Sequence, residues 1–102
     1  MKILHITGQK EWQRALEVGA YQADTLAEQG FIHCCLDSQF EGVLSEWFAG
    51  ASNLVVLEID SDRLASPMKF ESAPNRQEKF PHVFGPINLD AVVKATKIEK
   101  NF

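Results

Sequence analysis

The sequence predicts an α+β fold in one domain, on three observations. Short β-branched apolar segments with a period of two alternate with two segments of helical period. The 102 residues suit a single hydrophobic core, since domains cluster around ~100 to 150 residues. A composition of 45% hydrophobic and 24% charged residues is ordinary for a globular protein. We therefore expect one unit spanning residues 1–102, without an internal boundary.

Three segments predict strands. Residues 2–7 (KILHIT) are short and apolar, which suits a strand near the middle of a sheet. Residues 31–35 (FIHCC) predict a shorter strand with Phe31, His33 and Cys35 on the same side. Residues 53–60 (NLVVLEID) are apolar on both faces, as expected of a strand that is covered from both sides.

Two segments predict amphipathic helices. In residues 10–18, apolar side chains recur at helical spacing from Trp12, and Gly19 stands where a left-handed C-cap would be. In residues 38–49, Ser38 and Glu41 fit a capping box. The apolar residues of the second helix are expected to pack into the main core and not to form a stacking platform: Phe40, Val43, Leu44, Trp47 and Phe48.

The remaining segments give weaker signals. Residues 21–30 have no clear period and are expected to form a connecting loop. Prolines interrupt the C-terminal part, so residues 72–82 are expected to be mostly loop. We expect short strands at residues 67–71, 83–84 and 96–99, and a helical turn at residues 89–93.

The charge and the lack of targeting signals limit the possible partners. A net charge of −4 gives no electrostatic support for general DNA or RNA binding. No apolar run approaches the ~18 to 20 residues that span a bilayer, and the N-terminus does not resemble a secretory signal. Cys34 and Cys35 are neighbours, which disfavours a structural disulfide. We therefore expect a cytoplasmic protein with reduced thiols and no membrane partner; the oligomeric state stays open.

Three histidines are the main candidates for chemistry, because each lies inside an apolar or aromatic segment. His5, His33 and His82 include no short H-x-H or H-x-x-x-H pair, so no metal site is predicted. Each histidine is equally consistent with a partly buried side chain that one backbone hydrogen bond satisfies. Phosphate-binding glycine motifs of the P-loop or Rossmann type are missing from the sequence.

Other polar side chains have competing interpretations. Cys35, near His33, would be a thiol nucleophile, but a small buried thiol fits better because neighbours on one strand face stand parallel. Glu58 follows an apolar run and is expected to mark where the strand reaches solvent. Glu71 lies eleven residues before His82 and borders a loop, where it would reach the rim of a cleft.

Several motifs together resemble domain-of-unknown-function family 952, small bacterial proteins of about this length. The resemblance covers nearly the whole chain: HIT at residues 5–7, EQGFIHCC at 28–35, LVVLEID at 54–60, KFE at 69–71 and FPHVFGPINLDAVV at 80–93. That family resembles the ADP-ribosyltransferase-like domains, which include the RNA 2′-phosphotransferases. The resemblance implies a split, mixed β-sheet with two main helices and a cleft that holds NAD in active relatives.

The resemblance also implies roles for particular residues. The ribose-holding role on the first strand would fall on His5, with Thr7 nearby, and the next motif role on His33 with Cys35. The carboxylate role would fall on Glu71, which would stabilise oxocarbenium character at a ribose. The implied catalytic set is His5, His33, Glu71 and His82, and the implied cofactor-binding set is His5, Thr7, His33 and Cys35.

Two departures from the family pattern separate two functional hypotheses. Cys35 stands where the family usually has Ser, and Phe84 where it usually has Tyr, so two hydroxyl groups are missing. We therefore place a non-catalytic module that binds a nucleotide-like ligand or another protein first. A transferase acting on NAD or on an ADP-ribosylated or phosphorylated nucleotide is second. Protonated histidines would bind an anionic nucleotide better, so affinity is expected to rise as pH falls through roughly 6.5.

Overall fold

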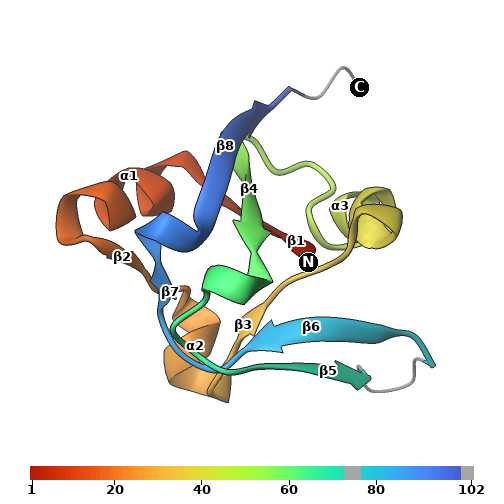
Figure 1. The fold of residues 1–102 in the computed structure, drawn as a ribbon. Helices are drawn as coiled ribbons and strands as arrows, with labels where there is room; N and C mark the ends of the chain where they lie inside the picture. Colours follow the sequence, from red (N-terminus) through yellow and green to blue (C-terminus); the bar gives the residue numbers. More distant parts are fainter. Residues whose placement is uncertain (73–76, 100–102) are drawn as a thin grey trace.

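A computed structural model describes residues 1–72 and 77–99 (Figure 1). Eight strands and three α-helices follow one another along this part of the chain. In chain order they are β1 (Lys2–Gly8), α1 (Gln9–Val18), β2 (Ala20–Tyr21), α2 (Asp24–Gln29), β3 (Ile32–His33), α3 (Phe40–Trp47), β4 (Leu54–Asp60), β5 (Met68–Ser72), β6 (Lys79–Val83), β7 (Ile87–Asn88) and β8 (Val92–Ile98). Short 3₁₀ turns lie at Asp37–Gln39, Ser61–Arg63 and Leu89–Ala91.

The strands form three small sheets, which gives the predicted α+β class and a split β-structure. Their orders are β1-β4-β8, β2-β7 and β3-β6-β5, and each strand pairing among the described residues is antiparallel. In Figure 1 the β5–β6 ribbon lies at the lower right, away from α1 and β2. No helix of the described residues is long and apolar enough to cross a membrane.

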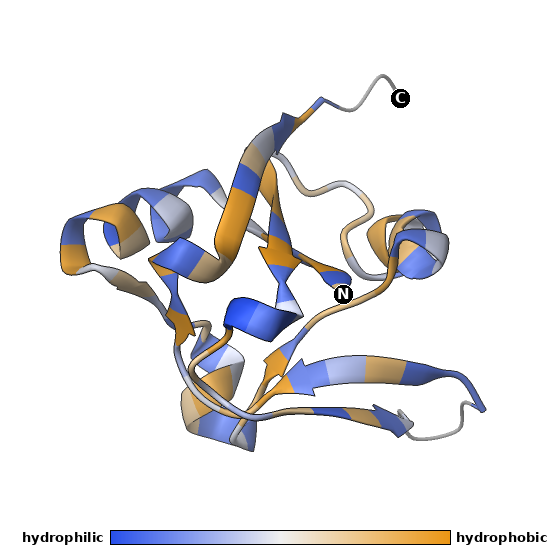
Figure 2. Ribbon diagram, viewed as in Figure 1, coloured by the Kyte–Doolittle hydropathy of each residue, from blue (hydrophilic) through white to orange (hydrophobic). Residues whose placement is uncertain are grey.

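β4 is the centre of the core, as its apolar sequence predicts. It pairs with β1 on one edge and with β8 on the other, and Leu57 and Ile59 are fully buried. Ile3 of β1 and Ile32 of β3 are fully buried in the same cluster. Figure 2 shows this concentration of apolar residues along β4, whereas β5 and β6 mix polar and apolar residues.

The short strand β3 connects two of the sheets. Ile32 pairs with Val83 of β6 within its own sheet. Three residues further on, the backbone of Cys35 exchanges both hydrogen bonds with Leu4 of β1, at 2.7 and 2.8 Å. The strand predicted at residues 31–35 is therefore only partly right. Residues 32 and 33 pair with β6, and Cys35 instead forms a bridge to β1. β1 was predicted near the middle of a sheet. It pairs with β4 on one side, and among residues 1–72 and 77–99 only this bridge lies on its other side.

The first predicted helix is confirmed, and the second is only partly right. α1 ends at Gly19, which has the predicted left-handed conformation at φ 100°. α3 forms, but Trp47 is 66% exposed and no residue of this helix is buried, so its predicted place in the main core is wrong. The predicted Ser38 capping box is also wrong, because the Gln39 side chain accepts the hydrogen bond from the Leu36 amide instead.

Two predicted loops contain regular structure. Residues 21–30 hold α2, a six-residue helix that ends at Gly30 with φ 84°. Residues 72–82 hold most of β6, which pairs with β5 despite Pro81; residues 73–76 of that prediction lie outside the described residues. β8 begins at Val92, four residues earlier than predicted. The helical turn predicted at 89–93 is a 3₁₀ turn at Leu89–Ala91.

Candidate functional site

The register of the sheet β3-β6-β5 gathers polar and aromatic side chains on one of its faces. His33 stands opposite His82, and Lys69 of β5 stands opposite His82 from the other side. With a period of two, Glu71 follows Lys69 on the same face. We call this surface the histidine face; it consists of Phe31, His33, Lys69, Glu71, His82 and Phe84.

His82 lies at the centre of the histidine face. His82 is only 5% exposed, and its Nδ1 donates a hydrogen bond to Oε1 of Glu71 at 2.9 Å. Glu71 itself has 44% of its side chain exposed. The Phe31 ring stacks on the His82 ring, with centroids 4.2 Å apart and planes 18° from parallel. One face of the imidazole is therefore covered, and its Nε2 has no hydrogen-bond partner among residues 1–72 and 77–99.

His33 is the exposed histidine of the face. Nε2 donates to Oε1 of Gln29 at 2.7 Å, which leaves Nδ1 as the unprotonated nitrogen of a neutral ring. Its ring stands 76° from that of His82, with centroids 5.2 Å apart. Partial burial, and then the charge of His82, lower the pKa of His33. The two rings form one interacting pair.

His5 lies beneath the face, in the core. Nδ1 donates to the carbonyl oxygen of His33 at 2.5 Å, and Nε2 lies 2.7 Å from the hydroxyl of Tyr21. The Tyr21 and Thr7 hydroxyls are 2.8 Å apart. Burial lowers the pKa of His5 to about 4 and raises that of Tyr21 to about 12, so both side chains are neutral near pH 7.

The neutral state fixes the direction of the hydrogen bonds around His5. Because a carbonyl oxygen only accepts, the single ring proton of His5 sits on Nδ1. Nε2 then accepts from the Tyr21 hydroxyl, which in turn accepts from the Thr7 hydroxyl. His5 and Thr7 therefore hold the backbone of His33 in place and have no nitrogen or hydroxyl group left for a ligand.

The cysteines and Glu58 stand apart from the face. Cys34 and Cys35 are free and buried, as predicted. Burial, and then the charge of Asp37, raise the pKa of Cys35 to about 11, which disfavours a thiolate nucleophile near neutral pH. Glu58 is half-buried and forms an ion pair with Lys2 at 3.3 Å, in keeping with its predicted place where the strand meets solvent.

The structure brings together three of the four residues in the implied catalytic set. His33, Glu71 and His82 meet on one face, whereas His5 reaches them only through the His33 backbone. Sequence reasoning placed Phe31 on the same side of its strand as His33 without naming it as a site residue, and it missed Gln29 and Lys69. A period of two from Glu71 would have found Lys69, but Gln29 belongs to a helix that the sequence did not predict.

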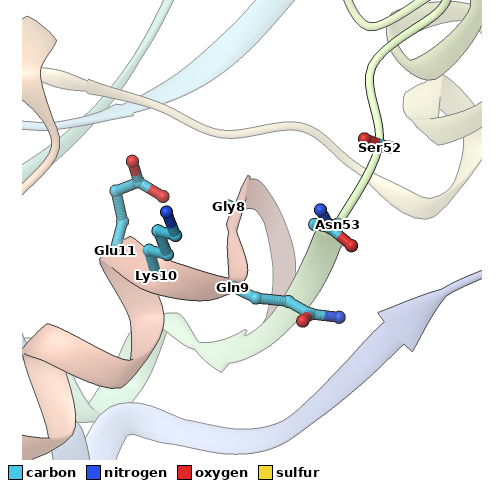
Figure 3. A pocket seen from close by; sticks show the side chains of 6 residues that line it. All are labelled: Gly8, Gln9, Lys10, Glu11, Ser52 and Asn53. Atoms are coloured by element: carbon cyan, nitrogen blue, oxygen red, sulfur yellow. The ribbon is translucent and has the colours of Figure 1, made fainter.

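Two open hollows lie elsewhere on the surface. One, of about 500 Å³, borders the start of α1 and is lined by Gly8, Gln9, Lys10, Glu11, Ser52 and Asn53 (Figure 3). The other, of about 320 Å³, is lined by Met1, Lys2, Glu58, Asp60, Asp62 and Val93. Neither is lined by a histidine. Within residues 1–72 and 77–99, no group of three or more His, Cys, Asp or Glu side chains is arranged to hold a metal ion.

Comparison with known proteins places the chain in a family. The crystal structure of protein CC0527 from Caulobacter crescentus is 25% identical, with a TM-score of 0.89 over 99% of this chain and 89% of that one. The solution structure of CC0527 is 26% identical, with a TM-score of 0.84 over 98% and 86%. No curated protein matches. The model of the family described as "Protein of unknown function (DUF952)" matches residues 6–95, and the chain belongs to this family.

Proposed function

We propose that the protein binds a nucleotide-like ligand on the histidine face. The observation that carries the proposal is the meeting of His33, His82 and Glu71, from three strands, against the ring of Phe31. Groups of this kind, far apart in sequence and gathered in one place, are typical of ligand sites.

The chemistry of the face suits the parts of a nucleotide. The Phe84 and Phe31 rings, with centroids 5.5 Å apart, offer apolar surface to a base, and stacking of a base on an aromatic ring contributes ~1 to 3 kcal/mol. Lys69 is exposed, with Nζ 5.8 Å from the centre of the Phe84 ring, and supplies a cation for a phosphate. Glu71 has an exposed carboxylate that accepts hydrogen bonds from ribose hydroxyl groups.

A transferase acting on NAD or on an ADP-ribosylated or phosphorylated nucleotide is the second candidate. The pairing of Glu71 with His82 favours it, because a carboxylate that holds an imidazole is a common arrangement for moving protons. We also propose that the fold is of the ADP-ribosyltransferase type and that the protein is cytoplasmic. NAD is the cofactor that this second candidate would use.

Calorimetric titration tests the binding proposal. NAD, ADP-ribose and a 2′-phosphorylated nucleotide are titrated into the wild type, His33→Ala and Lys69→Ala. Each variant is expected to weaken binding about tenfold or more, which corresponds to ~1.4 kcal/mol. Lys97→Ala is the matched control, because Lys97 is an exposed strand lysine on β8, in a different sheet. If the wild type binds none of the three at millimolar concentration, the nucleotide proposal is wrong.

A further inference from the structure

We propose that His33 and His82 are an acid–base pair that cleaves a phosphoester bond of a ribonucleotide bound on the histidine face. The inference rests on the proposed function, since the same face must first bind the nucleotide. It adds the reaction and the bond that reacts.

Each histidine has one nitrogen engaged and one free. The carboxylate of Glu71 occupies Nδ1 of His82, and the amide of Gln29 occupies Nε2 of His33. The other two nitrogens have no hydrogen-bond partner among residues 1–72 and 77–99. His33 is an exposed residue, and Nε2 of His82 is not fully buried, because no fully buried side-chain nitrogen or oxygen of the non-exposed residues in that part of the chain lacks a partner.

The two rings are close enough for one small tetrahedral group to reach both. Their centroids are 5.2 Å apart and their planes 76° apart, which is an edge-to-face contact, so such a group would lie beside the pair and not between the rings. An acid or a base acts at about 2.6 to 3.2 Å from the atom that exchanges the proton. In the proposed complex, a phosphate beside the contacting rings meets the free nitrogen of each, and Lys69, opposite His82 in the register, lies on the same face to bind a phosphate oxygen.

The charges on the face favour one protonated and one neutral ring. Partial burial, and then the charge of His82, lower the pKa of His33, so His33 is the ring that stays neutral, and the carboxylate of Glu71 lies 2.9 Å from Nδ1 of His82 to stabilise a positive charge there. The other charged groups of the face are Lys69 and Glu71 on β5, and the partner from α2, Gln29, is uncharged. Hydrolysis of a phosphoester by general acid–base catalysis requires one protonated group and one unprotonated group at the same pH.

The reaction balances without an added cofactor or oxidant. Nδ1 of neutral His33 takes a proton from water as the water oxygen forms a bond to phosphorus. The bond between phosphorus and a ribose oxygen breaks, its electron pair stays on that oxygen, and the oxygen takes the proton from Nε2 of protonated His82. Glu71 holds Nδ1 of His82 and stabilises its imidazolium before the transfer. A second proton exchange with solvent restores both rings.

The engagement of Glu71 favours this bond over a nicotinamide–ribose bond. Oxocarbenium character is stabilised by a carboxylate that faces the sugar, and one oxygen of Glu71 is already bound by His82. An alkoxide leaving group instead needs a proton donor, which protonated His82 supplies.

Hydrolysis of adenosine 2′,3′-cyclic phosphate, followed by ³¹P NMR, tests the inference. The wild type is expected to open the ring with a bell-shaped dependence of kcat on pH. His33→Gln should lower kcat by roughly 100-fold or more, since general acid–base catalysis contributes ~10² to 10⁴. Glu71→Gln should lower kcat by about tenfold or more, and Lys97→Gln should change nothing.

The outcomes separate the inference from the proposed function. Binding of the cyclic nucleotide without hydrolysis by the wild type, or hydrolysis that His33→Gln leaves intact, overturns the acid–base pair and leaves the binding site. Absence of binding to the cyclic nucleotide and to the three ligands above overturns both. His33 is exposed and its side chain is bonded only to Gln29 within the described chain, so this variant is expected to fold.

Discussion

Nδ1 of His5 donates a hydrogen bond to the carbonyl oxygen of His33, and this contact joins the core to the histidine face. The His5 ring is buried and neutral, while the His33 side chain lies at the surface. An imidazolium is stabilised by water, and the core around His5 offers none. The stability of the fold, and with it the position of His33, therefore depends on His5 remaining unprotonated.

The protein is expected to lose stability below pH 6.5 because of His5. Its pKa is about 4 in the folded state against an ordinary value of 6.5, so the unfolded chain binds a proton first. Stability is therefore complete above pH 6.5 and falls by about 1.4 kcal/mol for each pH unit as pH drops toward 4. Urea titrations at pH 7.5 and pH 5.0 should differ by roughly 2 kcal/mol in the free energy of unfolding.

His5→Gln is the matching variant, because glutamine does not titrate. This variant should be less stable than the wild type at pH 7.5. Its free energy of unfolding, however, should change much less between pH 7.5 and pH 5.0 than that of the wild type. His33→Gln should keep that difference in large part. A wild-type stability that is flat from pH 7.5 to pH 5.0 would contradict the burial of His5.

Gly30 and Gly42 are expected to respond to alanine in opposite directions. Gly30 ends α2 with φ 84°, just before the histidine face, and a Cβ there would meet no atom within 4 Å. Gly30→Ala should therefore cost roughly 1 to 2 kcal/mol through backbone strain alone. Gly42 lies inside α3 and is equally open, so Gly42→Ala should add roughly 0.5 to 1 kcal/mol. Equal effects in thermal unfolding would rule out the left-handed turn at Gly30.

Removal of the Trp47 side chain is expected to cost little. Trp47 is 66% exposed, so Trp47→Ala should lower the free energy of unfolding by under ~1 kcal/mol. Ile59→Ala, at a fully buried position of β4, should cost ~2 to 5 kcal/mol. Denaturant titration of both variants measures the comparison; a Trp47→Ala loss near that of Ile59→Ala would mean that α3 packs more deeply than described.

The two thiols are expected to react slowly in the native protein. Burial raises the pKa of Cys34 and, together with the charge of Asp37, that of Cys35, and only a thiolate reacts quickly. A disulfide reagent at pH 8 should label neither thiol at the rate of free cysteine. In guanidinium chloride both should react at once, which provides the control, and fast labelling of the native chain would show that the strand opens readily.

Sequence patterns predicted the strands of the core well because burial on both faces leaves a clear signal. The run Leu54–Leu57 in β4 is such a case. The pattern of α3 misled because helical spacing shows that a helix has an apolar side, but not which surface covers it. Trp47 therefore looks the same in sequence whether it lies in the core or at its edge. α2 was missed because six residues are too few to establish a period.

The candidate site was predictable only in part, since its assembly depends on strand register. His33, Glu71 and His82 were selected as polar residues in apolar segments, and all three lie on one face. The sequence did not reveal that His5 faces the other way, into the core, because its environment is set by Tyr21, sixteen residues away. Nor did it indicate that Lys69 stands opposite His82, which follows from the pairing of β5 with β6.

The short strand β3 has a consequence for local motion, because the residues after it are tied on both sides. The Cys34 amide donates to the carbonyl of Pro81 at 3.0 Å, and the Cys35 amide donates to that of Leu4 at 2.8 Å. Separate release of this segment would break bonds to two different sheets. In deuterated solvent, these two amides should consequently exchange among the slowest of the chain, at rates set by global unfolding. The backbone that carries His33 would then be as rigid as the centre of the core, although the side chain it carries stands in water.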